Sequence, residues 1–175
     1  YDNRADTGNI RNRPETGGGG VRDIGVYTYG AVRFVTGAEP DALQARLILE
    51  NGVDTWAQVT GSFAGPLGGF TYSAITSMRL HPRQEVTFHG DAGLIRLTAP
   101  FNPAVFGEAQ VELHRPGLSV TTERFPGANH YVLQVEAFGR ALRDGVAYPC
   151  PLEFTRGTQA MIDRVFAGAE VIAQP

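Results

Sequence analysis

The middle of the chain alternates apolar and polar side chains, a pattern typical of strands that bury one face. Residues 43–50 carry apolar side chains at every second position. Asn51-Gly52 follows, a dipeptide that favours a two-residue hairpin turn. The next segment, 53–63, then forms the partner strand, and its buried face would consist of Val53, Ala57, Val59 and Phe63.

The same period recurs in five further segments, each bounded by Gly, Pro or Asp-Ala-Gly. These segments are 70–78, 84–90, 94–99, 109–115 and 118–124. Short connections between successive strands favour antiparallel pairing. The sequence therefore predicts about seven strands, most of them antiparallel.

One face of this sheet would be left without helices, and it mixes polar and apolar side chains. It would carry Asp54, Trp56, Gln58 and Thr60 beside Thr71, Ser73, Ile75 and Ser77. Such a face is compatible with solvent, but a half-polar surface that holds a tryptophan also suits a subunit interface.

Three segments show the helical period instead. The first, 20–36, has a stripe of Val21, Ile24, Thr28, Ala31 and Val35. The second ends at Gly145 and has a stripe of Tyr131, Val135, Phe138 and Leu142. The third, 153–168, would bury Phe154, Met161, Ile162, Val165 and Phe166. The order of helix, strands and two helices predicts an α+β domain: a large, mostly antiparallel open sheet with helices packed on one face.

Composition excludes several classes of function. The formal net charge is -3 and the 15 basic residues are scattered, so nucleic acid and membrane surfaces are not expected partners. All 15 are arginines, which excludes Schiff-base chemistry and a P-loop lysine from this chain. The 4 histidines are far apart and there is 1 cysteine, so no metal site is expected.

Gly17 to Gly20 form the one glycine cluster and lead directly into the first helix. Their spacing does not fit a dinucleotide-binding GxGxxG motif, and no Lys-Ser or Lys-Thr follows for a P-loop. Accessible backbone N–H groups at a helix start favour an anion or a polar ligand oxygen there.

Asp23 and Tyr27 lie four residues apart in this helix and would share one face. An acid and a phenol would then point together toward a ligand. Alternatively, Asp23 complements the helix dipole and Tyr27 is a core aromatic whose hydroxyl is satisfied. Spacing alone leaves both interpretations open.

Several segments resemble the C-terminal domain of the glucose-fructose oxidoreductase/inositol dehydrogenase (Gfo/Idh/MocA) family. They are TGGGGVRDIGVYTYGAVRFVTGAEP, TFHGDAGLIRLTAPFNP and ANHYVLQVEAFGRALRDGVAYPCPLEFTRGTQAMIDRVF, in that order. The family pattern of three glycines, two residues, Asp, three residues and His or Tyr falls on Gly18 to Gly20, Asp23 and Tyr27. The resemblance extends from about Asn9 to Phe166.

The resemblance implies a fold like the C-terminal domains of dihydrodipicolinate reductase and glyceraldehyde-3-phosphate dehydrogenase. It implies that residues 1–175 form a single C-terminal domain for substrate binding and oligomerisation, with the N-terminal Rossmann domain outside this chain. NAD or NADP would be bound mainly by that absent domain, and no cofactor-binding residue is expected here. A homo-oligomer that associates through the open sheet face is expected, and the single cysteine, Cys150, is compatible with a reducing, cytoplasmic compartment.

The resemblance also implies roles for individual residues. Tyr27 would be the proton donor or acceptor at the reacting oxygen of a sugar, polyol or related hydroxyl or carbonyl compound, and Asp23 an orienting contact. Arg11, Arg13 and His130 are candidates for substrate binding. The isolated domain should be inactive as a dehydrogenase. The alternative is a non-catalytic sugar-binding or dimerisation module without cofactor chemistry.

Overall fold

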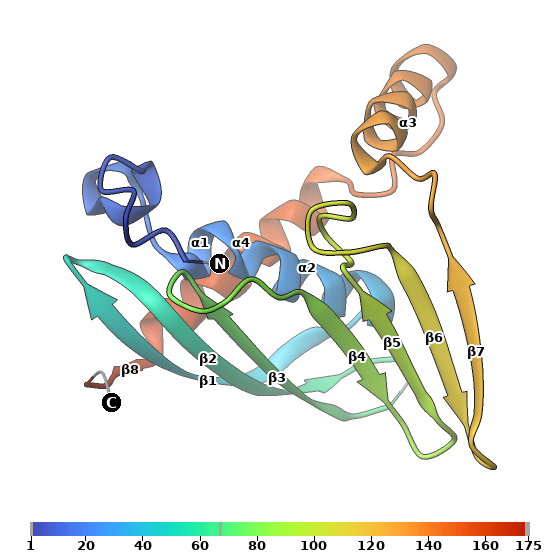
Figure 1. Ribbon diagram of the computed structural model, residues 1–175, viewed down its shortest axis with the longest axis horizontal. Helices are drawn as coiled ribbons and strands as arrows, with labels where there is room; N and C mark the ends of the chain where they lie inside the picture. Colours follow the sequence, from blue (N-terminus) through green and yellow to red (C-terminus); the bar gives the residue numbers. More distant parts are fainter. Residues whose placement is uncertain (1, 67, 174–175) are drawn as a thin grey trace. The chain divides into compact units, whose positions relative to one another are not determined.

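The computed structural model describes residues 2–66 and 68–173, which belong to two compact units (Figure 1). The first unit comprises residues 1–81 and 151–175, and the second comprises residues 82–150. The second unit is thus inserted into the first along the chain. The α+β class and the mostly antiparallel pairing are confirmed, and the strands form two four-stranded sheets, one in each unit.

The sheet of the first unit is built around the predicted hairpin. Strands β1 (Glu39–Glu50) and β2 (Val53–Ala64) pair antiparallel, and β2 also pairs antiparallel with β3 (Phe70–Ser77). Asn51 and Gly52 have φ angles of 51° and 80°, as a tight hairpin turn requires. A short strand not predicted from the sequence, β8 (Ala169–Val171), pairs parallel with β1. Its three residues are too few to produce a periodic signal.

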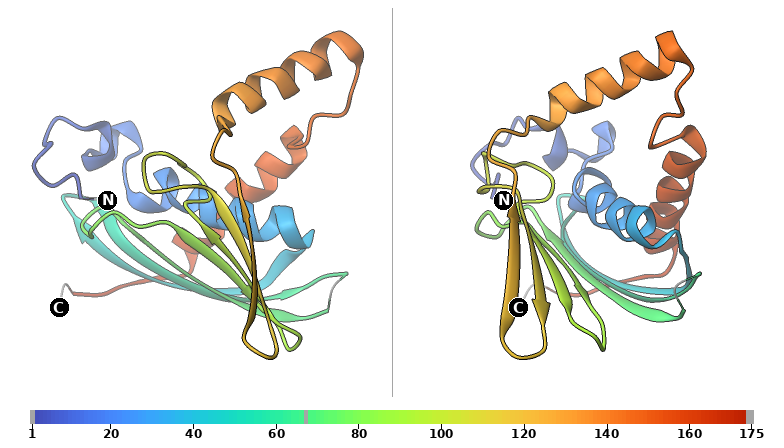
Figure 2. Two further views of the ribbon diagram at one scale, coloured as in Figure 1. Left: turned by 45° about the vertical axis from the view of Figure 1, so that its right-hand side comes forward. Right: turned by 90° about the vertical axis from the view of Figure 1, so that its right-hand side faces the viewer.

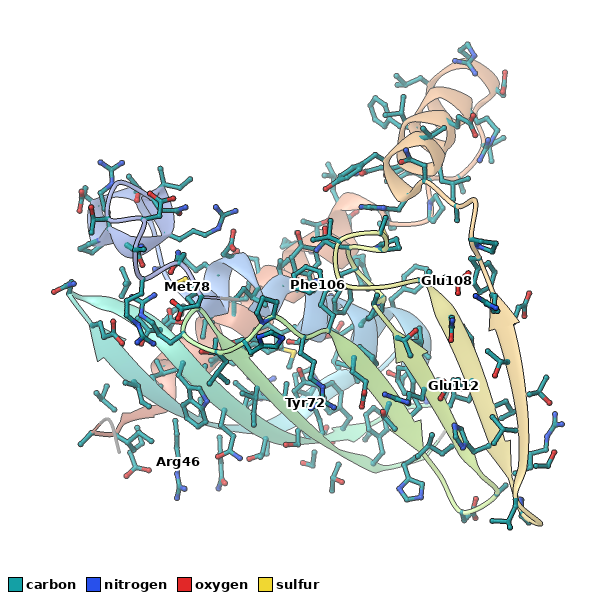
Figure 3. All side chains as sticks on the ribbon, viewed as in Figure 1. Arg46, Tyr72, Met78, Phe106, Glu108 and Glu112 are labelled. Atoms are coloured by element: carbon teal, nitrogen blue, oxygen red, sulfur yellow. The ribbon has the colours of Figure 1, made fainter. Side chains whose placement is uncertain are left out.

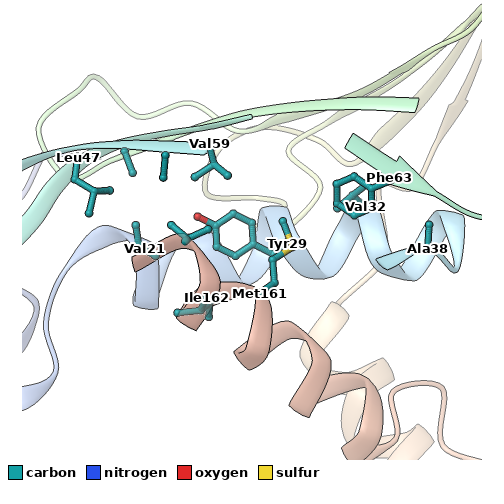
Figure 4. Packing of buried hydrophobic residues seen from close by; sticks show 12 residues of the cluster. Val21, Tyr29, Val32, Ala38, Leu47, Val59, Phe63, Met161 and Ile162 are labelled. Carbon is teal, nitrogen blue, oxygen red and sulfur yellow. The ribbon is translucent and has the colours of Figure 1, made fainter. Parts of the chain in front are cut away.

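Three helices cover one face of this sheet: α1 (Gly20–Asp23), α2 (Gly25–Thr36) and α4 (Leu152–Ala167). Figure 2 shows α2 and α4 side by side. Figure 4 shows Tyr29 of α2 and Met161 of α4 packed toward strand residues such as Val59. The first unit therefore has its hydrophobic core between this helical layer and the sheet.

The single predicted helix over 20–36 is wrong, because the helix is interrupted at Ile24 (φ -107°, ψ -37°). The buried face then restarts one residue later than the pattern indicated. Val35, expected in the buried stripe, is 54% exposed, whereas Tyr29 is fully buried at 0%. A Cβ on Gly25 would lie 2.6 Å from the ring of Tyr29, so glycine is required where the second helix begins.

Arg33 joins α2 to α4 from inside the first unit. Its guanidinium donates hydrogen bonds to the carbonyl oxygen of Phe154 at 2.7 Å and to the hydroxyl of Thr158 at 2.6 Å. It also pairs with Glu39 and lies over the ring of Phe154, 4.6 Å from its centroid. Arg33 is only 6% exposed, so these partners replace the water that its charge would otherwise bind.

A β-bulge in the hairpin changes which residues face the helices. Trp56 pairs with Ile48 but Asp54 pairs with Leu49, so Thr55 is an extra residue on β2. The prediction that Asp54 lies on the open face is therefore wrong, since it is 2% exposed; Ser77, opposite Trp56, is also buried at 8%.

The rest of the open face agrees with the prediction. Thr71, Ser73 and Ile75 are exposed, and Trp56 is partly exposed. Arg46 of β1 points away from the helices (Figure 3). A mixed polar and apolar surface of the first unit is thus available to solvent or to another chain.

The second unit contains β4 (Glu85–His89), β5 (Leu94–Thr98), β6 (Gln110–Arg115) and β7 (Ser119–Arg124), paired antiparallel in chain order. All four predicted strands are confirmed. Helix α3 (His130–Asp144) follows and ends at Gly145 as predicted. Its predicted apolar stripe is exposed: Tyr131, Val135, Phe138 and Leu142 are between 54% and 71% accessible.

None of the helices in the described residues is both long enough and apolar enough to cross a membrane.

Candidate functional site

The glycine cluster follows two short 3₁₀ helices, η1 (Ile10–Asn12) and η2 (Pro14–Thr16). The N–H groups of Gly18 and Gly19 donate to the carbonyl oxygens of Arg13 and Arg11, at 3.1 and 3.0 Å. A Cβ on Gly18 would lie 2.5 Å from the carbonyl oxygen of Arg11. The cluster therefore allows two backbone segments to approach closely before the helix begins.

Arg79 fastens this N-terminal segment to the sheet. Its guanidinium donates to the side-chain oxygens of Asn3 at 2.7 Å and Asn12 at 3.3 Å, and pairs with Glu50 at 2.8 Å. The Arg79 side chain is only 10% exposed. The backbone that leads to Arg11 and the glycines is thus anchored at two points.

The start of α1 is occupied by a carboxylate of the chain itself. The N–H of Val21 donates to Oδ2 of Asp54 at 2.7 Å. Gly19 has a φ of 111°, and a Cβ there would overlap Oδ1 of Asp54. The expectation of an external anion or ligand oxygen at this end is wrong, because the bulge in β2 places Asp54 there.

Burial raises the pKa of Asp54 to about 6, although hydrogen bonds from the backbone of Val21 and Gly20 and the charge of Arg22 act in the opposite direction. The loss of water around the carboxylate therefore outweighs the donors that it receives.

Asp23 is held by an arginine from the preceding segment. Nε of Arg11 lies 2.6 Å from Oδ2 of Asp23, and the two side chains are 40% and 32% exposed. The structure thus brings together a residue predicted to orient substrate and one predicted to bind it. Both side chains are therefore partly accessible.

Tyr27 lies in the first turn of α2 and is 44% exposed. Its N–H donates to the carbonyl oxygen of Ile24 at 3.1 Å, across the helix interruption. The interpretation of Tyr27 as a core aromatic is therefore wrong, because Tyr29 takes that place. Tyr29 is fully buried, and this burial raises its pKa well above the usual range. Of the two tyrosines of α2, Tyr27 is therefore the accessible one.

The two other candidates, Arg13 and His130, belong to different units of the chain. The side chain of Arg13 is 3.7 Å from Glu15, in the segment before the glycines. His130 is the first residue of α3 in the second unit, and its ring centroid is 4.0 Å from that of Tyr131. Their roles in substrate binding stay predictions.

Within residues 2–66 and 68–173, no group of three or more His, Cys, Asp or Glu side chains is arranged to hold a metal ion.

The sequence did not indicate that Asp54 holds the start of α1 or that Arg33 connects α2 to α4. Asp54 was assigned to the opposite face by regular alternation, and a single sequence gives no sign of the bulge. The partners of Arg33 on α4 are 121 and 125 residues away along the chain. No local pattern could have indicated them.

The chain is similar to known proteins, both over its N-terminal half and over most of its length. A family model described as the GFO/IDH/MocA C-terminal domain matches residues 1–96. An uncharacterized oxidoreductase of Rhizobium meliloti is 31% identical over 171 residues, which cover 94% of this chain and 50% of the relative.

A dTDP-3,4-didehydro-2,6-dideoxy-alpha-D-glucose 3-reductase of Streptomyces antibioticus is 31% identical over 167 residues, 94% of this chain and 50% of the relative. Among solved structures, the 3-ketoreductase KijD10 of Actinomadura kijaniata, in complex with NADP and TDP-benzene, has a TM-score of 0.76 at 21% identity. That match covers 96% of this chain and 51% of the other, and it shows a common fold. The chain spans about half the length of these relatives.

Proposed function

Because the chain belongs to the GFO/IDH/MocA C-terminal domain family, we propose that it forms the substrate-binding and catalytic half of an NAD(P)-dependent oxidoreductase. The substrate would be a sugar, a sugar nucleotide or a related hydroxyl or carbonyl compound. This class is supported by the relative named as a dTDP-sugar 3-reductase and by a similar fold in a 3-ketoreductase complex with NADP.

The glycine cluster of this chain does not fit a dinucleotide-binding loop. The glycine cluster lacks the GxGxxG spacing, and the start of α1 is filled by Asp54. We therefore assign the cofactor to a separate Rossmann domain, where it would supply the acceptor or donor of a hydride.

Tyr27 is the residue proposed to exchange the proton. When a carbinol is oxidised, its hydroxyl proton must leave as charge develops on oxygen, and in the reverse direction the carbonyl oxygen must gain one. A phenol is suited to either step, although in water it is almost entirely protonated at neutral pH and needs a nearby cation to become a base. The family resemblance implies that a lysine of the Rossmann domain supplies that cation.

Asp23 and Arg11 would orient the substrate beside Tyr27. The ion pair fixes the carboxylate of Asp23, and both side chains are partly exposed, with groups of the kind that hydrogen-bond to sugar hydroxyls. The observation that carries the proposal is this partly exposed ion pair, whose Asp23 lies four residues before the half-exposed Tyr27, in a segment that matches the family model.

The test is a Tyr27→Phe variant of the protein that contains this chain together with a cofactor-binding domain. We expect kcat to fall by roughly 100-fold or more, since general acid–base catalysis is typically worth 10²–10⁴. Tyr148→Phe is the matched control, because its ring packs on Phe138 in the second unit and remains after the hydroxyl is removed. Full turnover in Tyr27→Phe would rule out the role of this phenol.

The same assay separates the enzyme from a non-catalytic sugar-binding module. The longer protein should reduce or oxidise a nicotinamide cofactor with a sugar-type substrate, and this chain alone should not. A longer protein without any such activity would favour the binding module.

A further inference from the structure

The candidate residues depend on a very short helix. Helix α1 has only 4 residues, which is too few to be stable without tertiary contacts. It packs on strand β2 and joins α2 after the interruption at Ile24. Something outside the helix must therefore fix its start.

Three features place Asp54 at that start. The bulge at Thr55 puts Asp54 opposite Leu49, on the helical side of β2. The carboxylate accepts the N–H of Val21, which is itself 0% exposed. Gly19 leaves the space that Oδ1 occupies, because any side chain there would overlap it.

Backbone hydrogen bonds connect the start of α1 to the candidate residues. The N–H groups of Asp23 and Ile24 donate to the carbonyl oxygens of Gly19 and Gly20, at 3.3 and 2.7 Å. The carbonyl oxygen of Ile24 then accepts the N–H of Tyr27 at 3.1 Å. A shift of the first turn of α1 would thus be passed to both Asp23 and Tyr27.

We propose that Asp54 is a positioning residue for the candidate site: it holds the start of α1 from the bulged strand and thereby sets the placement of Asp23 and Tyr27. The proposal rests on the function proposed above, in which these two residues act on the substrate. Asp54 itself is only 2% exposed, so it would act through these two residues.

The surroundings of Asp54 make its state measurable. Arg22 on α1 is the charged side chain that favours the carboxylate form, and Tyr29 on α2 is the buried phenol on which the Asp54 charge acts. Burial raises the pKa of Asp54 to about 6. The carboxyl group can therefore be protonated in a mild pH titration of the folded protein. A backbone amide that donates to a carboxylate is expected to shift in frequency when that carboxylate is protonated.

The first experiment follows the amide signal of Val21 by NMR, in the longer protein labelled with ¹⁵N-valine. In the wild type this signal should titrate with a midpoint near pH 6. In Asp54→Asn it should stay constant over the same range, and in the exposed control Asp91→Asn it should titrate as in the wild type. A Val21 signal at the same position in the wild type and in Asp54→Asn would overturn the assignment, because the amide would then not be bonded to this side chain.

The second experiment measures steady-state kinetics well below the unfolding temperature of each variant. Asp54→Ala should lower kcat by roughly 10- to 100-fold with a smaller change in KM, because displacement of catalytic groups by about 1 Å can cost 10²-fold. Asp54→Asn keeps an acceptor oxygen and should retain most of the turnover. Asp91→Asn should match the wild type.

The two proposals can fail separately. If Tyr27→Phe keeps full turnover, the proposed function fails whatever the behaviour of Asp54. If Tyr27→Phe is impaired but a folded Asp54→Ala variant turns over like the wild type, the positioning role fails and the proposed function stands.

Discussion

Gly19 has a backbone conformation that other residues rarely adopt, and the position that its Cβ would take is already occupied. Its φ of 111° and ψ of 155° lie in a region used almost only by glycine, and the carboxylate of Asp54 lies where a Cβ would be. Gly17 also has a positive φ, 69°, but nothing lies within 4 Å of its Cβ position. The two glycines therefore differ in what an added methyl group would meet.

We predict that Gly19→Ala destabilises the protein more than Gly17→Ala. The Gly17 change should cost about 1–2 kcal/mol, the usual penalty for a left-handed residue with a side chain. The Gly19 change adds displacement of Asp54 and should exceed about 3 kcal/mol. Urea unfolding of both variants checks this, and equal losses would show that the contact with Asp54 contributes nothing.

At the scale of elements, a buried guanidinium helps to attach α2 to α4. Arg33 holds the carbonyl oxygen of Phe154 and the hydroxyl of Thr158 at the start of α4. Gly157 is required there, since a Cβ on it would overlap the Arg33 side chain. Helix α4 is thus held in the first unit by a specific polar contact as well as by hydrophobic burial.

Replacement of Arg33 by Met should lower the free energy of unfolding by about 3 kcal/mol, because it removes charge-assisted hydrogen bonds, worth about 1.5–3 kcal/mol each, from two oxygens of α4. Arg46→Met is the matched control. Arg46 pairs with Glu170 at 3.4 Å, but both side chains are more than 60% exposed, and exposed pairs of this kind contribute about 0–1 kcal/mol. Thermal or urea unfolding distinguishes the two, and a similar loss in both variants would contradict the role of Arg33.

Elements with local signals were predictable from the sequence. The hairpin of β1 and β2 was found because alternation and Asn51-Gly52 are both contained within the segment. The position of Asp54 was not, because one extra residue in a strand reverses the face of every residue before it. The helix interruption at Ile24 was missed because apolar residues occupy both the predicted and the observed stripe, for example Val35, which is exposed, and Val32, which is buried.

The candidate site was predictable in part. The motif that contains Asp23 and Tyr27 could be recognised by family resemblance, and spacing alone could not separate Tyr27 from a core residue. The structure resolves that point through exposure, 44% for Tyr27 against 0% for Tyr29. The contact of Arg11 with Asp23 depends on the path of the intervening backbone, which residue patterns do not define.

At the scale of the whole molecule, the sheet of the first unit has a face that no helix of that unit covers. Trp56 is partly exposed on this face, and Ile75 of β3 is 56% exposed. Surfaces that mix aromatic, apolar and small polar residues are common in subunit interfaces. We propose that copies of this chain associate through this face.

Trp56→Arg should then shift the oligomer toward monomer, because it adds a charge within the proposed interface. Light scattering at several protein concentrations measures the mass. Val105→Arg, on a residue that is 77% exposed in the second unit, should leave the mass unchanged. A wild-type protein that is monomeric throughout, or an unchanged mass in Trp56→Arg, would refute this interface.

The insertion of the second unit between His81 and Pro151 has a consequence for synthesis on the ribosome. The strands of the second unit pair in chain order, so each new hairpin can form as soon as it emerges. Folding of the first unit cannot be completed at that stage, because Met161, Ile162 and Val165 of its core are translated after the whole second unit. Until then Tyr29 and Val59 lack the residues that cover them, and the nascent chain presents this apolar surface to chaperones.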